Sequence, residues 1–526
     1  PSPYLTGILD KFFDGKLTPF IETNRGCPFT CSFCHTGADY FHKLNKFSED
    51  RVKEEIEYIG KRAEQLGITN LHFADVNFGM YPQDRKTCEL LIKSKKKYGW
   101  PLQVMATTGK NSKARIIEIT KILGNMFGIN MSMQSMDEQV LTNIRRSNIK
   151  LEHMTEVNNH LRSEGRSTKG ELIMSLPGET KETFIKGLNN ILNANTSSVT
   201  IYTLMMLHGT EFKNPQYRDE FKYKGKFRIV PLNFGEYDGQ RIMDCEEVGV
   251  ENKDLSFEDY LYIRVLALLV ESLYNGKPFY EFFKFSKKFD IQPASLLRIL
   301  YDNISDSSKS VQKLINEFVD ETKNELWDTE ENLIKHYKKD ENYIKLKNGK
   351  VGGNLIFKYK SKSLVEFGLD WIDYLEQQIT KIIIEKHMKI DSAKIIKSEL
   401  SEIAKFCRLK INALLNANVE TKSVKGIFNY DILKWLEDEK ENKRLSEYKF
   451  PLESKKLIFE FTKDQKAIRK DVFKRYGTSI NAISKIVTRI SNLESQFRKV
   501  RYENDNYLRD VYKKVGENFV KYALSN

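Results

Sequence analysis

The sequence predicts an α/β fold: a partial, TIM-like (β/α)6 barrel followed by a mainly α-helical C-terminal region. Three observations lead to this prediction. Short apolar strands alternate with amphipathic helices over residues 21–211, a pattern typical of parallel sheets. Polar side chains follow several of these strands, at the end of a barrel where binding sites are built. From residue 256 onward, apolar residues recur at helical spacing.

The first strand and the first helix lie on either side of a cysteine-rich loop. Residues 21–23 read as a short strand that leads into this loop. Ser48 is a suitable N-cap, and apolar residues then recur every three or four positions until Gly67. We therefore expect a helix between Ser48 and Gly67.

The remaining elements continue the same alternation. Strands are expected at 71–78, 101–107, 127–134, 170–176 and 198–207, and helices at 83–98, 113–123, 137–165 (two helices divided near Asn148) and 180–194. Right-handed crossovers between successive parallel strands curl such a sheet into most of a barrel.

The predicted domains follow from changes in this pattern. They are an N-terminal linker at 1–20, the barrel at 21–211, an irregular extension at 212–255, and a mainly helical region of one or two subdomains at 256–526. Within the last region, a glycine-rich break suggests a hairpin near 347–357, and a helix is expected over 480–525. The sequence assigns no role to residues 256–526.

Three cysteines in the first loop form the motif that says most about chemistry. Cys27, Cys31 and Cys34 are spaced C-x3-C-x2-C, so each thiolate can hold one iron of a cubane cluster and leave the fourth iron open. A structural zinc loop is an alternative, although zinc usually takes four converging ligands. Three unrelated buried thiols are a second alternative.

The cysteine spacing, with Phe33 before the last cysteine, resembles the signature of the radical S-adenosylmethionine (radical SAM) superfamily. The resemblance implies a [4Fe-4S] cluster whose open iron chelates S-adenosylmethionine (SAM). It also implies reductive cleavage of SAM to a 5′-deoxyadenosyl radical. An electron donor such as flavodoxin or ferredoxin and an unidentified substrate would be the partners. Phe33 is included among the residues expected to line the cofactor site.

The short sequence motifs at the strand ends resemble those of cobalamin-linked members of this superfamily. By that resemblance, Asp75 and Asn77 lie near the methionine end of SAM. Ser132 and Gln134 lie near its ribose. Ile173 and Leu176 flank the adenine, and Glu171 belongs to the same site. From the residues alone, Asp75 and Asn77 could instead cap a turn, Ile173 and Leu176 could be barrel core, and Glu171 a half-exposed strand residue.

Composition and charge narrow the class of protein. The chain has 526 residues and a net charge of +13. Its basic residues are spread widely among many acids, so nucleic-acid binding is not favoured. The most apolar stretch, 265–270, is too short to span a bilayer. The scattered Cys88, Cys245 and Cys407 suit a reducing cytoplasm, where we expect the protein to act.

The Asp-x-His-x-x-Gly motif that is usual in cobalamin domains is missing, because none of the eight histidines follows an aspartate by two positions. Cobalamin is therefore expected only with a domain that this sequence does not include, and the chain is expected to be a fragment or to lack that domain. We expect a radical SAM enzyme, a methyltransferase in a cobalamin-containing longer form. The alternatives are a tRNA- or nucleic-acid-modifying member and a non-enzymatic, metal-stabilised interaction protein.

Overall fold

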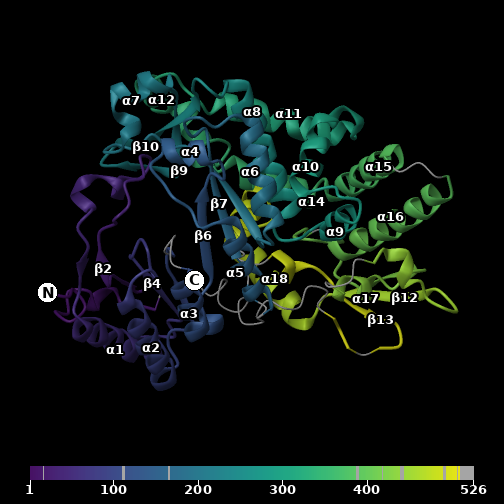
Figure 1. Ribbon diagram of the computed structural model, residues 1–526, viewed down its shortest axis with the longest axis horizontal. Coiled ribbons are helices and arrows are strands. Elements are labelled where there is room, and N and C mark those ends of the chain that lie inside the picture. The colour runs from purple at the N-terminus through teal and green to yellow at the C-terminus, as the bar shows by residue number, and fades with distance from the viewer. Residues whose placement is uncertain are drawn as a thin grey trace. The chain divides into compact units, whose positions relative to one another are not determined.

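The computed structural model describes most of the chain in two compact units (Figure 1). The described residues are 1–15, 17–108, 113–163, 166, 168–386, 390–417, 419–438, 443–489, 493–505 and 507–509. Unit 1 comprises residues 1–225 and 247–256, and unit 2 comprises 226–246 and the described residues from Phe257 onward. Each unit is considered by itself below.

Unit 1 is built around parallel strands, as the sequence predicts. Its strands are β1 (Phe20–Ile21), β4 (Asn70–Phe73), β5 (Gln103–Met105), β6 (Ile129–Gln134), β7 (Thr168–Met174) and β8 (Ser198–Thr203). They pair in the orders β1-β4-β5 and β6-β7-β8, with every pairing parallel. A parallel bridge between Val104 and Phe127 joins the two halves. This arrangement confirms the predicted α/β fold class.

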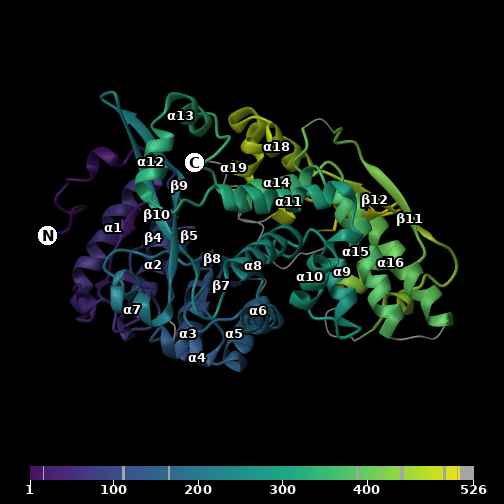
Figure 2. The ribbon, with the colours of Figure 1, turned by 90° about the horizontal axis from the view of Figure 1, so that it is seen from above.

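Helices between the strands cover the outer side of the sheet (Figure 2). They are α1 (Glu49–Leu66), α2 (Pro82–Tyr98), α3 (Lys113–Leu123), α4 (Glu138–Asn143), α5 (Leu151–Ser163) and α6 (Lys181–Asn193). The cap signals hold for α1, because the Ser48 side chain accepts a hydrogen bond from the Arg51 amide and Gly67 takes a left-handed conformation. The helix α1 packs on α2, and α2 packs on α3.

The prediction of an irregular extension at 212–255 is wrong. This segment contains α7 (Pro215–Phe221) and a long hairpin of β9 (Lys224–Tyr237) and β10 (Gln240–Glu251). The turn lies at Asp238 and Gly239, both with positive φ, the combination that two-residue hairpin turns prefer. Pro231, Gly225 and Gly235 are tolerated within β9 because a two-stranded ribbon consists of edge strands.

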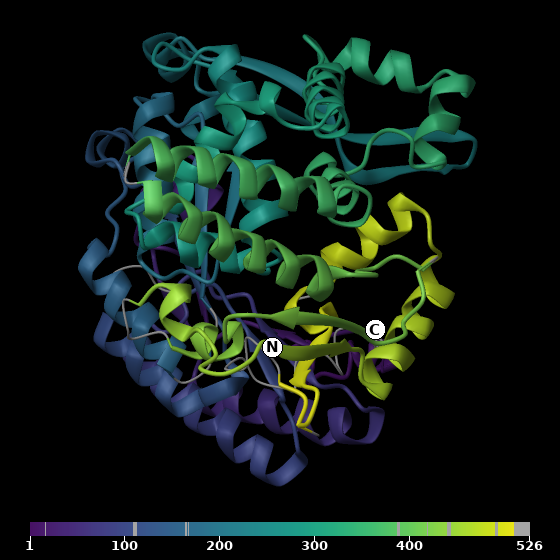
Figure 3. The same cartoon turned by 90° about the vertical axis from the view of Figure 1, so that its right-hand side faces the viewer.

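Unit 2 is mainly helical, as expected. Its helices are α8 (Phe257–Leu269), α9 (Tyr280–Lys287), α10 (Pro293–Asp302), α11 (Lys309–Asn324), α12 (Glu330–Tyr337), α13 (Asp340–Lys347), α14 (Leu355–Val365), α15 (Gly368–Lys386), α16 (Ile390–Ile411), α17 (Ile432–Glu437), α18 (Lys463–Tyr476) and α19 (Ile480–Arg489). Figure 3 shows α15 and α16 as two green helices lying side by side.

Two local predictions in unit 2 are wrong. The hairpin expected near 347–357 is the start of α14, where the Asn354 side chain caps the helix by accepting from the Phe357 amide at 3.2 Å. The helix expected over 480–525 ends at Arg489 and is followed by β13 (Lys499–Tyr502). This strand joins β11 (Val424–Phe428) and β12 (Lys455–Glu460) in an antiparallel sheet. Residues 511–526 lie outside the described part of the chain.

Candidate functional site

The three cysteines lie on one loop between β2 (Asn24–Arg25) and β3 (Asn45–Lys46), which pair antiparallel at its base. Cys27 and Cys31 are buried, and Cys34 is half-buried. The amide of Cys27 donates to the carbonyl of Phe41 at 2.8 Å. The loop is thus closed on itself by its own backbone.

Glycines allow this close packing. Gly26 has a φ of +112°, and a Cβ there would lie 2.4 Å from the Lys43 carbonyl oxygen. A Cβ on Gly37 would lie 2.4 Å from the Cys31 carbonyl oxygen. Because no side chain fits at either contact without a backbone shift, the path of the loop depends on glycine at both positions.

Ser32 joins the cysteine loop to the other half of unit 1. Its amide donates to the Ile144 carbonyl at 3.0 Å, and its carbonyl accepts from the Glu211 amide at 3.2 Å. Its hydroxyl lies 3.2 Å from the hydroxyl of Tyr217 on α7. These three contacts fix the loop against the segment after α4 and the segment after β8.

Two buried polar side chains contact the cysteine sulfurs. The Nδ2 of Asn77 donates to Sγ of Cys27 at 3.3 Å. The Nη1 of Arg146 lies 4.0 Å from Sγ of Cys31, while its Nη2 donates to the Ser132 carbonyl. Both donors would stabilise negative charge on the sulfurs, which thiolate ligands carry.

Asp75 supports the segment that leads into the loop. It is 1% exposed. Its Oδ1 accepts from the Thr23 amide at 2.8 Å, and its Oδ2 accepts from Nδ2 of Asn24 at 2.7 Å and from the Thr23 hydroxyl. Burial raises the pKa of Asp75 to about 6, although the hydrogen bonds from Thr23 oppose this shift. Its predicted place near the methionine end of SAM stays a prediction.

The carboxylate of Glu171 interacts with polar side chains on neighbouring strands. Its Oε1 accepts from Nδ2 of Asn130 at 2.9 Å, and its Oε2 accepts from the Ser132 hydroxyl. The hydroxyl of Tyr202 on β8 lies 3.4 Å from Oε1. The structure therefore brings together Ser132 and Glu171, which the sequence placed in one site, and adds Asn130 and Tyr202.

Gln134 ends β6 with an unusual backbone. Its φ is +65°, and the pairing of β6 with β7 shifts register between Ser132 and Gln134. Such irregularities re-aim a side chain beside many active sites. Its Oε1 is buried without a hydrogen-bond partner in the described structure, so it is an acceptor that suits a ligand hydroxyl.

The apolar candidates separate into two environments. Leu176 is completely buried in a hydrophobic cluster with residues such as Val140 and Phe212, which fits the alternative that it belongs to the core. Phe33 and Ile173 are only partly buried and pack against the same cluster. Their predicted contacts with the cofactor remain predictions.

The cysteine loop offers the donors that a cubane cluster uses. Among the described residues, no three His, Cys, Asp or Glu side chains converge on one point. In a cubane, each of three thiolates binds a different iron. The buried, hydrogen-bonded sulfurs of Cys27 and Cys31 suit that role.

Comparison with known families decides the assignment of this region. The family model for the Radical SAM superfamily matches residues 21–191. These residues are a radical SAM domain. The match begins at the first barrel strand and includes the cysteine loop, β4, β6 and β7, whereas Tyr202 on β8 and Tyr217 on α7 lie beyond it.

Relatives extend the similarity beyond the radical SAM domain. The chain is 32% identical over 293 residues to the cobalamin-dependent radical SAM methyltransferase TokK of Streptomyces tokunonensis. It is 32% identical over 290 residues to the 2-(S-pantetheinyl)-carbapenam-3-carboxylate methyltransferase of Streptantibioticus cattleyicolor. Each alignment covers 52% of this chain and 41% of the relative, so the chain matches less than half the length of either.

Two solved structures are similar at lower levels. The cobalamin-dependent SAM radical enzyme OxsB has a TM-score of 0.36 at 13% identity, over 77% of this chain and 60% of OxsB. The radical SAM methyltransferase TsrM from Kitasatospora setae has a TM-score of 0.33 at 15% identity, over 37% of this chain and 36% of TsrM.

Sequence reasoning missed several side chains at the radical SAM site. Arg146 follows α4, and only the fold brings its Nη1 to 4.0 Å from Sγ of Cys31. Thr23, Asn24 and Tyr202 carry no motif that identifies them. A period-two reading of β8 would have placed the side chain of Tyr202 on the face opposite buried Val199 and Ile201.

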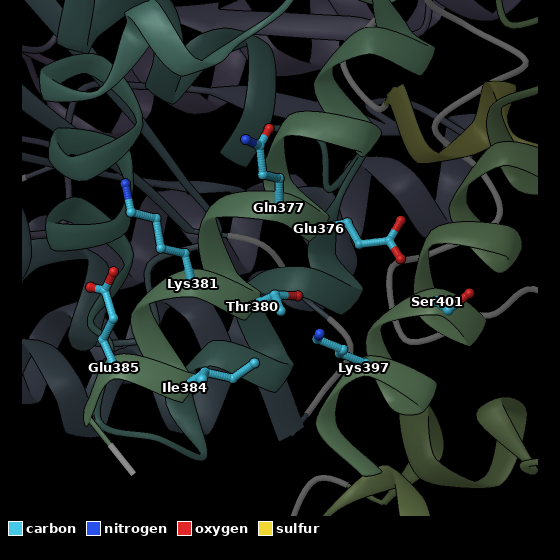
Figure 4. A pocket seen from close by; sticks show the side chains of 8 residues that line it. All are labelled: Glu376, Gln377, Thr380, Lys381, Ile384, Glu385, Lys397 and Ser401. Atoms are coloured by element: carbon cyan, nitrogen blue, oxygen red, sulfur yellow. The ribbon is translucent and has the colours of Figure 1, made fainter. Parts of the chain in front are cut away.

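Unit 2 contains an open groove of about 610 Å³ between α15 and α16 (Figure 4). Glu376, Thr380 and Lys381 line it from α15, and Lys397 and Ser401 line it from α16. Charges of both signs face this groove, so its lining does not select one class of ligand. Within the described part of the chain, no helix is long and apolar enough to cross a membrane.

Proposed function

We propose that this chain is the radical-generating part of a radical SAM enzyme acting on an unidentified substrate. The observation that carries the proposal is the C-x3-C-x2-C loop of the radical SAM domain, with two buried cysteines hydrogen-bonded or close to polar donors. When bound, a [4Fe-4S] cluster and SAM supply one-electron cleavage of SAM to methionine and a 5′-deoxyadenosyl radical.

The residues of the chain hold, orient and shield this chemistry. Cys27, Cys31 and Cys34 would be the cluster ligands. Asp75 would keep the loop in place through Thr23 and Asn24. Since the closed backbone of the loop buries two of the sulfurs, it would also keep water from them.

The end of the barrel would bind SAM through polar and apolar contacts. We assign Ser132, Gln134 and Glu171 to the ribose, since Gln134 offers an unused buried acceptor and Glu171 already organises the hydroxyl of Ser132. We assign Phe33 and Ile173 to the apolar side of the cofactor, because both keep some exposed surface while packing on the core.

The relatives support methyl transfer as the outcome. TokK is named a cobalamin-dependent radical SAM methyltransferase, and the second relative is also named a methyltransferase. We propose methyl transfer with cobalamin for a longer form that carries a cobalamin-binding domain. We assign no residue of the present chain to cobalamin.

We also propose a reducing, cytoplasmic setting with flavodoxin or ferredoxin as electron donor. The support is chemical: the chain's six cysteines are all free thiols in the structure, and a cluster with an open iron needs protection from oxidants.

Anaerobic reconstitution with iron and sulfide tests the proposal. The wild-type chain should bind about four irons and four sulfides, and its visible absorbance should bleach on addition of dithionite. Cys27→Ala, Cys31→Ala and Cys34→Ala should each lose this cluster. Cys88→Ala and Cys245→Ala are matched controls and should keep it. A wild-type chain that binds one zinc and no iron would contradict the proposal.

A further inference from the structure

The turn between β4 and α2 holds the side-chain amide of Asn77 against the cysteine loop. Asn77 is completely buried, and its Nδ2 lies 3.3 Å from Sγ of Cys27. The amide of the next residue, Phe78, donates to the Thr107 carbonyl at 2.9 Å. The ring of Phe78 stacks on Phe73 of β4 with centroids 4.6 Å apart. The Asn77 side chain therefore points at Cys27 from a fixed backbone.

Asp84 locks the rest of this turn. Its Oδ2 accepts from the amide of Gly79 at 2.7 Å and from the amide of Tyr81 at 2.9 Å. A Cβ on Gly79 would lie 2.3 Å from Cδ1 of Ile119, so the turn also packs tightly against α3. Because the turn is fixed on both sides, Asn77 cannot leave Cys27 without breaking several contacts.

The chemistry of an iron-bound thiolate decides which end of the amide matters. Such a sulfur has lost its proton and can only accept a hydrogen bond. Of the two ends of the Asn77 amide, only Nδ2 can donate. Reduction adds one negative charge to a cluster, and a donor to a ligand sulfur stabilises the more negative state.

We propose that Asn77 raises the reduction potential of the cluster through a hydrogen bond to the Cys27 sulfur. In this arrangement Nδ2 of Asn77 donates to Sγ of Cys27. The inference rests on the proposed function, since it requires a cluster on Cys27, and it makes Asn77 a determinant of how readily the electron donor reduces that cluster.

The test is the midpoint potential of the reconstituted cluster, measured by spectroelectrochemistry without SAM. Asn77→Leu removes the donor and should make the potential more negative. Asn77→Ala removes the same donor with a smaller side chain and should shift the potential in the same direction. Asn158→Leu is the matched control, because Asn158 is equally buried but donates to Ala194 and Thr196. Its potential should equal that of the wild type.

Iron and sulfide contents separate the possible outcomes. Full clusters with identical potentials in the wild type, Asn77→Leu and Asn77→Ala would overturn this inference and leave the proposed function standing. A wild-type chain that assembles no cluster would overturn both. If only Asn77→Leu fails to assemble a cluster, the potential of Asn77→Ala decides: a more negative value supports the inference, and an unchanged value overturns it.

Discussion

A buried carboxyl group at the start of α6 should make the stability of unit 1 depend on pH. Glu179 is 1% exposed. Its Oε1 accepts from the Ser135 hydroxyl at 3.1 Å, and its Oε2 lacks a hydrogen-bond partner in the described structure. Burial raises the pKa of Glu179 from 4.5 to about 8; the Ser135 hydroxyl opposes this shift, and Asp137 adds to it.

The sign and size of the effect follow from this raised pKa. Between pH 4.5 and 8, the folded protein keeps a proton on Glu179 that the unfolded chain has lost. The free energy of unfolding therefore falls as pH rises through this window. At pH 7 the loss amounts to about 3 kcal/mol, since each unit of pKa difference corresponds to about 1.4 kcal/mol. Below the lower limit of the window Glu179 contributes no loss.

Glu179→Gln removes the ionisation and should abolish this loss. The free energy of unfolding of the apoprotein should be measured by urea titration from about pH 5 to about pH 8. Pulsed hydrogen exchange in β7 and α6 should monitor the unfolding of unit 1. The stability of Glu179→Gln relative to wild type should rise by about 3 kcal/mol between acidic and neutral pH. Glu182→Gln, an exposed position on α6, is the control. The same pH dependence in wild type and Glu179→Gln would refute the reasoning.

Three further predictions concern the cluster loop, the cofactor and the reaction. Gly26→Ala places a Cβ 2.4 Å from the Lys43 carbonyl oxygen and should reduce the iron content of the reconstituted protein. Gly128→Ala is the control, because a Cβ there meets open space, and its iron content should not change. Equal iron contents in the two variants would count against the loop's dependence on glycine. Ser132→Ala and Gln134→Ala should each weaken SAM binding by about 1–3 kcal/mol in calorimetry at unchanged iron content; wild-type affinity in both would return these residues to a structural role. The chain alone should cleave SAM slowly, without methylated product; coupled turnover on a defined substrate without methylcobalamin would contradict this.

Much of the barrel could be predicted because its signals are local. Ser48 and Gly67 mark the ends of α1, and the apolar runs at β4 to β8 are bounded by turn residues. The strands themselves are shorter than expected; β4 ends at Phe73 rather than at residue 78. The reason is that Asp75 and Asn77 turn away from the sheet to contact Asn24 and Cys27, and such long-range contacts leave no local pattern.

The hairpin of β9 and β10 shows a different kind of failure. Asp238-Gly239 is a strong hairpin signal, but Pro231 and three glycines around it read as breaks. The strands are long and exposed on parts of both faces, so they lack the alternation of a half-buried strand. Turn chemistry was the better guide here than the hydrophobic pattern.

The sequence predicts the candidate ligands of the site but not their surroundings. The spacing of Cys27, Cys31 and Cys34 predicts a cluster loop, and this assignment stays a prediction. The donor from Arg146 to Cys31 depends on the fold, since these residues lie 115 positions apart. Leu176 shows a different limit of prediction from sequence. A buried core residue and a residue that contacts a cofactor are both apolar, so the sequence pattern is the same for both.

The most direct test of the account is the yield of 5′-deoxyadenosine from SAM and dithionite. The reconstituted wild-type chain and Cys88→Ala should both produce it, and Cys31→Ala should produce none, because the account requires all three cysteines of the loop to hold the cluster. A Cys31→Ala chain that produced 5′-deoxyadenosine at the wild-type rate would contradict the assignment of this loop as the cluster site.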